Sequence, residues 1–313
     1  MIRRLIQPRK VISWNEFIQT HPAFSIAIDG YVKGEPRYDQ TGPRLNLNHH
    51  EEVDRFATRS TSGQLFVNIK QGLFNKFRSN DEAEATLYLN DPDQDGCLTD
   101  WMTRNHQRFT GFKSEPLINK LIWAEDMLDA TAGAYPLPLE SDLMRDLSWI
   151  FEPYTSQITR MPELDAKGME GIIEAVGSRI DRYVLGKGEK LSPDARFEML
   201  HQENEWAMVK EIGPYARSGL YGSGNLGFIA FRGESPKGHY RYALGSMSHY
   251  VGFEVPFLID EFNKVEGISP DNPDRWGGGT TTGGSPRESG SKMNPGQLAA
   301  VATESLKKRK QAA

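Results

Sequence analysis

Three aspartates at alternating positions, Asp91, Asp93 and Asp95, have the spacing in this chain that most directly suggests chemistry. They follow the apolar segment 86–89 and precede a segment of helical apolar spacing, 98–102. The pattern predicts a strand, an acidic loop and a helix. The carboxylates then lie beyond the carboxyl end of a strand, where open α/β sheets bind ligands. Carboxylates this close repel one another unless a cation is present. A solvated acidic turn is the alternative, whereas an EF-hand loop is disfavoured because the twelfth position lacks a glutamate.

An adjacent pair of histidines, His49 and His50, comes after a second apolar segment, 24–28, which ends at Asp29. Neighbouring side chains on a strand point to opposite faces, so the two rings can converge only if they lie in a loop. The alternative is that both histidines are simply exposed polar residues. Because one chain contains two separate acidic strand ends, we favour metal binding.

A glycine-rich segment, 275–291, precedes a predicted helix over 295–308 and contains Arg275 and Arg287. Glycines let backbone N–H groups approach a phosphate closely, and arginine adds bidentate hydrogen bonds. A segment of this composition can also be a flexible linker. Since it is internal and contains both arginines, we favour an anion-binding loop. The glycines expected to contact substrate are Gly277, Gly278, Gly279, Gly283 and Gly284.

Apolar periodicity predicts an α/β fold, in which the strands over 24–28 and 86–89 alternate with helices and form a parallel sheet. The middle of the chain is expected to be mostly helical, with helices predicted over 13–20, 60–77, 117–130, 144–150, 169–184 and 196–212. Hydroxyl residues can cap the helix over 60–77 and leave its first N–H groups free for an anion. A smaller α/β domain is expected from strands over 226–231 and 240–245 and a helix over 256–262. The predicted division is a metal-binding domain over 1–185, a linker over 186–192 and a second domain over 193–313.

Composition excludes several classes of protein. The 313 residues, 38% of them hydrophobic, suffice for two domains, and no apolar run is long enough to cross a bilayer. A net charge of −5 argues against an extended nucleic-acid surface. Cys97 is the only cysteine, so it cannot form an internal disulfide. The first residues lack the apolar core of a secretion signal, which leads us to expect a cytoplasmic protein.

Taken together, these segments resemble the DHH phosphoesterase superfamily, which includes RecJ-like exonucleases, manganese pyrophosphatases and oligoribonucleases. Asp93 and Asp95 resemble the D-x-D of that family's first motif, and Asp29 resembles its strand-end aspartate. Asn48-His49-His50 resembles the signature from which the family takes its name.

The resemblance covers most of the chain. Asp126 or Asp129 would supply the last acidic ligand, and the segment 241–291 is similar to the family's associated C-terminal domain, whose glycine loop holds substrate. Here the acidic motif follows the histidine pair, whereas the family places it first, which implies a permuted or rearranged sheet. Asn48 and Leu89 stand where the family has an aspartate and a histidine.

The resemblance implies a metal-dependent phosphoesterase that hydrolyses a phosphodiester or a phosphorylated nucleotide-type substrate, with Mn²⁺ or Mg²⁺ as cofactor. The catalytic residues would be His49, His50 and Asp93. The metal ligands would be Asp29, His49, His50, Asp93, Asp95 and Asp129. The substrate would be a phosphorylated small molecule or a short oligonucleotide, bound by the two arginines and the glycine loop. If a metal site is lost, the chain would instead be a non-catalytic nucleotide- or phosphate-binding protein. A plain interaction protein with solvated acidic loops also stays open, and so does a homodimer.

Overall fold

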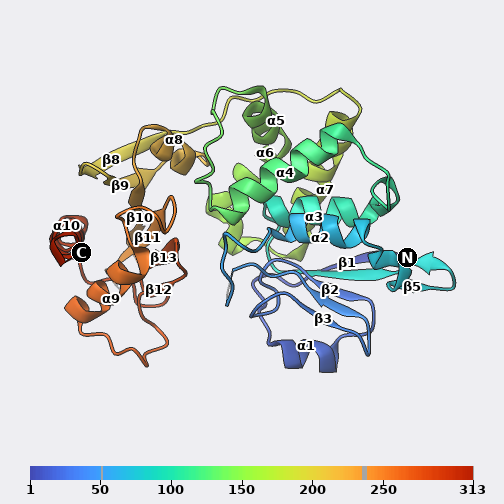
Figure 1. Cartoon of the computed structure of the whole chain (residues 1–313), viewed down its shortest axis with the longest axis horizontal. Coiled ribbons are helices and arrows are strands. Elements are labelled where there is room, and N and C mark those ends of the chain that lie inside the picture. The colour runs from blue at the N-terminus through green and yellow to red at the C-terminus, as the bar shows by residue number, and fades with distance from the viewer. Residues whose placement is uncertain (51, 235–237, 313) are drawn as a thin grey trace. The chain divides into compact units, whose positions relative to one another are not determined.

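The computed structural model describes residues 1–50, 52–234 and 238–312 and shows a mixed α/β protein, as predicted (Figure 1). The chain divides into two compact units: the first comprises Met1–Ala130 and Glu140–Ser192, and the second comprises Thr131–Leu139 and Pro193–Ala313. The second unit thus includes a segment, 131–139, that the sequence assigned to the first domain. The predicted linker lies in the first unit. Within the described ranges, no helix has both the length and the apolar composition needed to span a bilayer.

The first unit is built on a five-stranded sheet in the order β1-β7-β2-β4-β3. Its strands are β1 (Ile2–Ile6), β7 (Ala85–Leu89), β2 (Ser25–Ala27), β4 (Arg44–Asn46) and β3 (Arg37–Asp39). Neighbouring strands are parallel except β3 and β4. Ala27 pairs with Tyr88 of β7 and with Asn46 of β4, so β2, β4 and β7 end at the same edge of the sheet. The loops after these three strands contain Asp29, the histidine pair and the acidic turn.

Helices cover both faces of this sheet, with α2, α3, α4 and α7 on one face and α1 on the other (Figure 1). Helix α3 packs against α2, α4 and α7. The helices are α1 (Trp14–Thr20), α2 (Thr61–Lys70), α3 (Gln94–Arg104), α4 (Pro116–Ala130), α5 (Asp142–Ile150), α6 (Glu152–Thr155) and α7 (Ala166–Val184). A short hairpin and three 3₁₀ turns complete the unit: β5 (Arg78–Ser79), β6 (Glu82–Ala83), Leu73–Asn75, His106–Arg108 and Ile158–Glu163.

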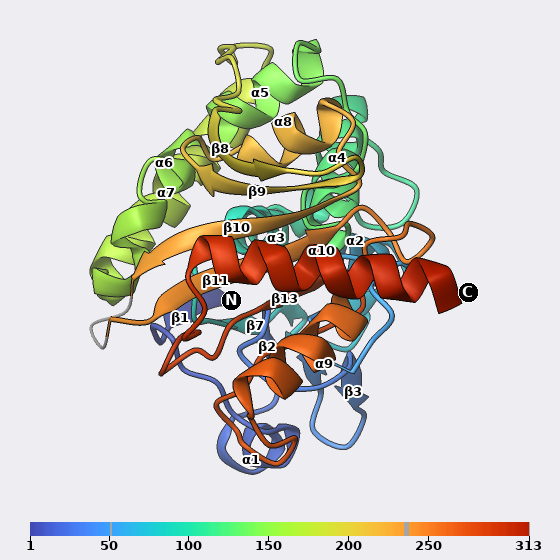
Figure 2. The ribbon, with the colours of Figure 1, turned by 90° about the vertical axis from the view of Figure 1, so that its left-hand side faces the viewer.

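The second unit has a six-stranded sheet in the order β12-β13-β11-β10-β9-β8. Its elements are β8 (Phe197–Gln202), β9 (Trp206–Glu211), α8 (Ala216–Gly222), β10 (Gly227–Glu234), β11 (Tyr240–Ser246), α9 (Val255–Glu266), β12 (Gly277–Gly278), β13 (Thr282–Gly284) and α10 (Pro295–Ala312). Strands β9 and β10 are parallel and the other pairs are antiparallel. Helices α9 and α10 lie on the same face of the sheet (Figure 2), over a core that includes Phe253, Phe262 and Trp276.

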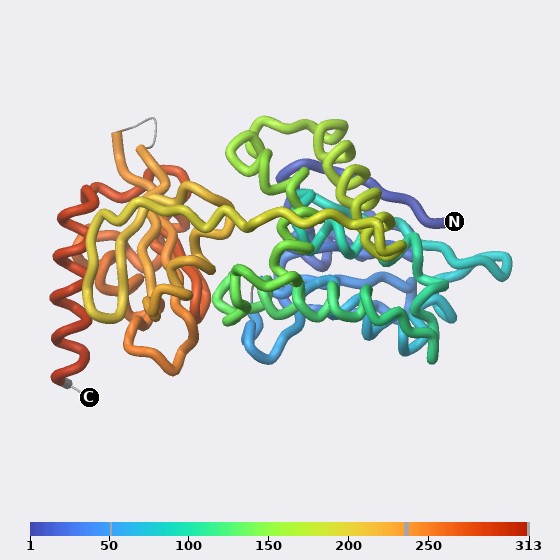
Figure 3. The backbone as a smooth tube through the Cα atoms, turned by 90° about the horizontal axis from the view of Figure 1, so that it is seen from above, coloured from blue at the N-terminus to red at the C-terminus, as the bar shows by residue number. Residues whose placement is uncertain are grey.

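The helix predicted over 196–212 is wrong. These residues form the antiparallel hairpin β8–β9, which Figure 3 traces in yellow. Strand β9 lies between β8 and β10, so side chains on both of its faces are buried, and the consecutive residues 206–209 are all 4% exposed or less. A continuous apolar run is typical of such an interior strand. The polar residues between the two strands, 203–205, form the turn.

The helix predicted over 60–77 is too long. Helix α2 ends at Lys70, and Gly72 has a φ of 96°, a left-handed conformation that glycine adopts without steric cost. A short 3₁₀ turn replaces the last predicted helical turn. The apolar residues beyond Gly72 therefore contact the core from a turn and do not continue the apolar face of the helix.

Candidate metal centre

The loops at the shared sheet edge bring potential metal ligands into two groups. One group contains Asp29, His49 and His50, the other contains His49, Asp95 and Asp129, and the ligand atoms in each lie within 4.8 Å of one another. His49 Nε2 belongs to both. It lies 3.2 Å from Asp29 Oδ1, 2.8 Å from Asp129 Oδ2 and 4.0 Å from Asp95 Oδ2. The histidine pair and the separate acidic strand ends of the sequence are thus brought together.

Local backbone geometry positions Asp29 and the histidine pair. Asp29 has a φ of 39°, in the left-handed region that few non-glycine residues occupy, and Gly30 continues the turn with a φ of 78°. Asp29 Oδ1 lies 2.6 Å from His50 Nε2. Asn48 fixes the histidine loop, because its side chain donates to the carbonyl of Gly34 and accepts from the backbone N–H of His50. Both the nitrogen and the oxygen of the Asn48 side chain are therefore engaged in holding this loop.

Several buried atoms at this site lack hydrogen bonds. Both ring nitrogens of His49 and Oδ2 of Asp129 are buried and have no hydrogen-bond partner among the described residues. The 2.8 Å approach of His49 Nε2 to Asp129 Oδ2 therefore does not have hydrogen-bond alignment. Two ligands bound to one ion at the usual distances of roughly 2.0–2.2 Å come about 3 Å apart. The spacing and the unmet polar atoms fit a pair of ligands that share a cation.

Electrostatics at the site also favour a positive charge. Burial alone would raise the pKa of Asp29, but the charge on His50, the close approach of His49 and the hydrogen bond with His50 hold it well below its usual value. Burial opposes charge on His49 as well, yet the charges of Asp129 and Asp29 raise its pKa to about 11. For Asp95, burial and the same two carboxylates raise the pKa to about 7. A proton on His49 balances the carboxylates, and a cation that binds there must displace that proton.

Asp93 lies at the edge of this centre. Its carboxylate shares a hydrogen bond with that of Asp29, and burial and the charge of Asp29 raise its pKa well above the usual value. Asp93 Oδ1 also accepts the N–H of Gly96 at 2.7 Å and so caps α3. It belongs to neither ligand group among the described residues, although the sequence assigned it as a ligand. Asp91 is exposed and is likewise outside both groups.

The start of α2 is not free for an anion, contrary to the sequence-based expectation. Asp95 accepts the N–H groups of Thr61 and Ser62 at 2.6 and 2.9 Å. Asp126 accepts the N–H of Ser60 and pairs with Arg59, both at 2.8 Å. These two carboxylates, together with the Ser60 hydroxyl that accepts the N–H of Gly63, thus already engage the first N–H donors of this helix.

These contacts also distinguish the two candidates on α4. Asp129 offers a carboxylate oxygen to the ligand group, whereas Asp126 is engaged at the start of α2. Arg55 supports the same corner by donating to the backbone carbonyls of Asp129 and Ala130. Neither Arg55 nor Glu125 was predicted to belong to the site. Glu125 is 3% exposed, and its pKa is raised well above the usual value by burial and then by the charge of Asp129. Glu125 and Asp129 are four residues apart on one helix, and this spacing indicates that their side chains lie on the same face.

The glycine-rich segment of the second unit forms a hairpin. Gly277 and Gly278 pair with Gly284 and Gly283 to make strands β12 and β13 at the edge of the sheet. A Cβ on Gly278 would lie 2.2 Å from the carbonyl oxygen of Thr282, so the close approach of the two strands requires glycine there. A flexible linker is inconsistent with this pairing.

Polar contacts fix the start of this segment. Asn263 bonds to both the N–H and the carbonyl of Trp276, which is fully buried, and the indole donates to Glu266 at 2.6 Å. Arg275 and Arg287 themselves are exposed, and neither has an ion-pair partner in the described parts of the chain. The segment therefore presents two free guanidinium groups on a fixed backbone.

No model of a known protein family matches the chain, and a search of curated proteins finds no match either.

Proposed function

We propose that this protein is a Mn²⁺- or Mg²⁺-dependent phosphoesterase that resembles the DHH superfamily. The observation that carries the proposal is the position of His49, whose Nε2 belongs to two ligand groups at once. A residue shared in this way suits a centre for two ions. The ligands are carboxylates and imidazoles with no thiolate, a set that suits manganese or magnesium.

In this proposal Asp29, His49 and His50 hold one ion, and His49, Asp95 and Asp129 hold the other. Bound ions would supply Lewis-acid activation of water and stabilisation of charge on the phosphoryl oxygens. Asp93 lies beside Asp29, and its raised pKa suits a carboxylate that accepts and returns a proton. The hairpin arginines would bind the phosphate of the substrate.

A non-catalytic phosphate-binding protein is the second candidate, and Asn48 and Leu89 favour it. The side chain of Asn48 is consumed in building the histidine loop, and Leu89 is 1% exposed and has no ligand atom. Both positions have ligands in the family that the chain resembles. A weaker centre would bind metal and substrate without turnover.

Hydrolysis of a phosphodiester panel with Mn²⁺, run beside metal analysis of the same protein, tests the proposal. We expect metal to be bound and at least one short oligonucleotide, cyclic dinucleotide or phosphorylated metabolite to be cleaved. Metal uptake without turnover of any member would support the binding protein. Absence of metal uptake would refute both and leave the acidic loops as solvated turns.

Substituting Arg287→Ala should weaken substrate binding and leave manganese uptake unchanged, because no metal ligand is altered. The expected loss is roughly 1.5–3 kcal/mol, the range for a hydrogen bond to a charged group. A raised KM with unchanged kcat would indicate uniform binding, and a lowered kcat would indicate contact in the transition state. Arg309→Ala is a suitable control, since Arg309 is an arginine of the same unit that pairs with Glu254. If Arg287→Ala and Arg275→Ala both behave like the parent, the hairpin does not bind phosphate.

A further inference from the structure

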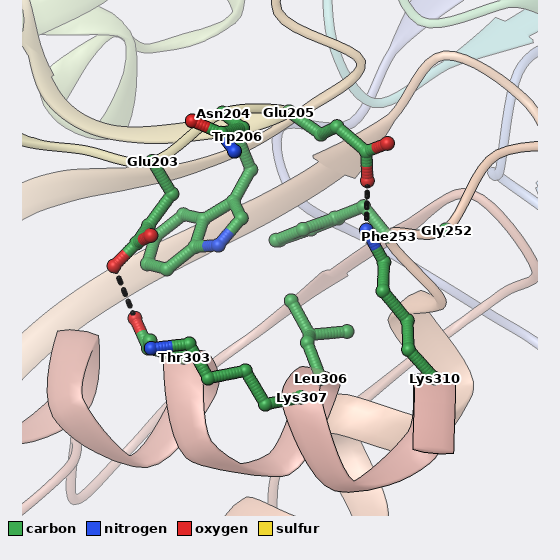
Figure 4. Close-up of a pocket in the computed structure, with 10 residues that line it drawn as sticks. All are labelled: Glu203, Asn204, Glu205, Trp206, Gly252, Phe253, Thr303, Leu306, Lys307 and Lys310. Carbon is green, nitrogen blue, oxygen red and sulfur yellow. Dashed lines mark hydrogen bonds and ion pairs between the residues drawn. The ribbon is translucent and has the colours of Figure 1, made fainter. Parts of the chain in front are cut away.

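The second unit contains a cavity of about 200 Å³ between the β8–β9 turn, the loop at Phe253 and helix α10 (Figure 4). Its floor is apolar, since Trp206, Phe253 and Leu306 are 4%, 1% and 6% exposed. The volume is below the roughly 300–1,000 Å³ of pockets for drug-sized ligands. The space therefore suits a group about the size of one aromatic ring.

Charged side chains of both signs surround this floor, and most are already compensated. Glu203 accepts a hydrogen bond from the Thr303 hydroxyl at 3.0 Å, and Glu205 pairs with Lys310; Figure 4 shows both contacts as dashed lines. Lys307 differs: its ammonium group makes no direct ion pair or hydrogen bond with a described residue, although, after the hydrogen bond from Thr303, its charge contributes to lowering the pKa of Glu203. The rim thus has one cation that is available to a ligand.

The indole N–H of Trp206 is a second available donor. It points into the cavity in Figure 4, and no described residue accepts a hydrogen bond from it. Buried tryptophan N–H groups usually find a partner. Two other indoles in this protein do so: Trp101 donates to Asp181 at 2.9 Å and Trp276 donates to Glu266 at 2.6 Å. The Trp206 N–H instead opens on the cavity, where it can donate to a ligand oxygen.

We propose that this cavity binds a small organic carboxylate whose apolar body is about the size of one aromatic ring. The carboxylate oxygens accept from Lys307 and from the indole N–H of Trp206. The apolar body contacts Phe253 and Leu306. Two donors that have no partner among the described residues favour an acceptor, and the apolar floor favours a body that gains by leaving water. The site is separate from the proposed phosphoesterase centre, and neither depends on the other.

Calorimetric titration of the full chain with 3-phenylpropionate tests this site, with two analogues that replace the carboxylate by a neutral amide or by an amine. We expect the carboxylate to bind and the analogues to bind at least about tenfold more weakly, because a charge-assisted hydrogen bond is worth more than 1.4 kcal/mol. Lys307→Gln should weaken carboxylate binding by about the same factor. Its matched control is Lys308→Gln, because the neighbouring Lys308 pairs with Glu304 and does not line the cavity.

Trp206→Phe provides the second test, since it removes the N–H and keeps an aromatic ring in the floor. The variant should show a cooperative thermal unfolding transition, as a folded protein does. It should bind 3-phenylpropionate more weakly than the parent. A ligand with a millimolar dissociation constant binds measurably at about 5 mM. If 3-phenylpropionate shows no binding at that concentration, the proposal is overturned. Equal binding of the amide or the amine, or equal weakening by Lys308→Gln, would also overturn it.

Discussion

Replacing His49 with glutamine should abolish manganese binding in both ligand groups. His49 is fully buried, and its Nε2 is the one atom that the groups have in common. Glutamine keeps a polar side chain of similar length but cannot supply an imidazole nitrogen. Loss of an outer-shell partner costs about 10–100-fold in metal affinity or activity. Because His49→Gln removes a direct ligand of both groups, we expect it to lower manganese affinity by more than about 100-fold.

Equilibrium dialysis and thermal unfolding with and without Mn²⁺ measure this effect. A ligand at one hundred times its dissociation constant stabilises the native state by about 2.7 kcal/mol. The parent should gain a stabilisation of this order, and His49→Gln should gain none. The variant should also be less stable than the parent without metal, because it leaves the carboxylates of Asp29 and Asp129 uncompensated in a buried site. The decisive measurement is therefore the change in unfolding free energy that Mn²⁺ causes in each protein.

His50→Gln is the matched control. His50 belongs to one ligand group only, and its side chain is 38% exposed. This variant should lose part of the bound manganese and keep the remainder. If His49→Gln and His50→Gln retain equal metal, or if His49→Gln is stabilised by Mn²⁺ as much as the parent, the shared-ligand arrangement is incorrect.

The positions of Asp29 and Asp95 near one another could be anticipated because each follows a short apolar segment, and the carboxyl ends of parallel strands meet at one edge. His49 follows β4, whose sequence Arg-Leu-Asn has no apolar pattern that predicts a strand. Helical spacing alone does not separate Asp129 from Asp126, since the two lie on the same helix face. Only the contacts of Asp126 with Ser60 and Arg59 show that it is engaged elsewhere. Such long-range pairings leave no periodic signal in the sequence.

Strand β1 is a second example of a long-range pairing that leaves no periodic signal in the sequence. Its residues alternate between partly buried and exposed, and its arginines make the segment look like a basic terminus. Arg4 is only 8% exposed at its side chain because it pairs with the buried Asp100, 3.1 Å away and 96 residues along the chain.

The β8–β9 hairpin was missed for a related reason. Strand β9 has a continuous apolar run because it pairs with β10 inside the sheet, and that partner begins at Gly227. Helical and interior-strand patterns are alike over such short stretches.

Replacing Asp95 with asparagine should have the second largest effect, because it disturbs two functions of one carboxylate. Asp95 Oδ1 and Oδ2 accept the N–H groups of Ser62 and Thr61, and the same side chain belongs to a ligand group. Asparagine keeps one acceptor oxygen but turns an NH₂ group towards a backbone N–H. The buried donor left unpaired costs about 1–3 kcal/mol. The loss of negative charge removes the ligand, so manganese should no longer bind to the group of Asp95 and Asp129.

Asp126→Asn separates these two effects. Asp126 is 2% exposed and accepts an N–H at the start of the same helix, but it belongs to neither ligand group within the described residues. This variant should lose about 0.5–2 kcal/mol of unfolding free energy, the usual range for a lost helix cap. Its uptake of manganese should equal that of the parent. Denaturant unfolding of both metal-free variants gives the capping contribution, and metal content gives the contribution of the ligand. If Asp126→Asn lost as much manganese as Asp95→Asn, the effect of Asp95 would arise from the position of α2. If Asp95→Asn bound manganese like the parent, Asp95 would serve only as the cap.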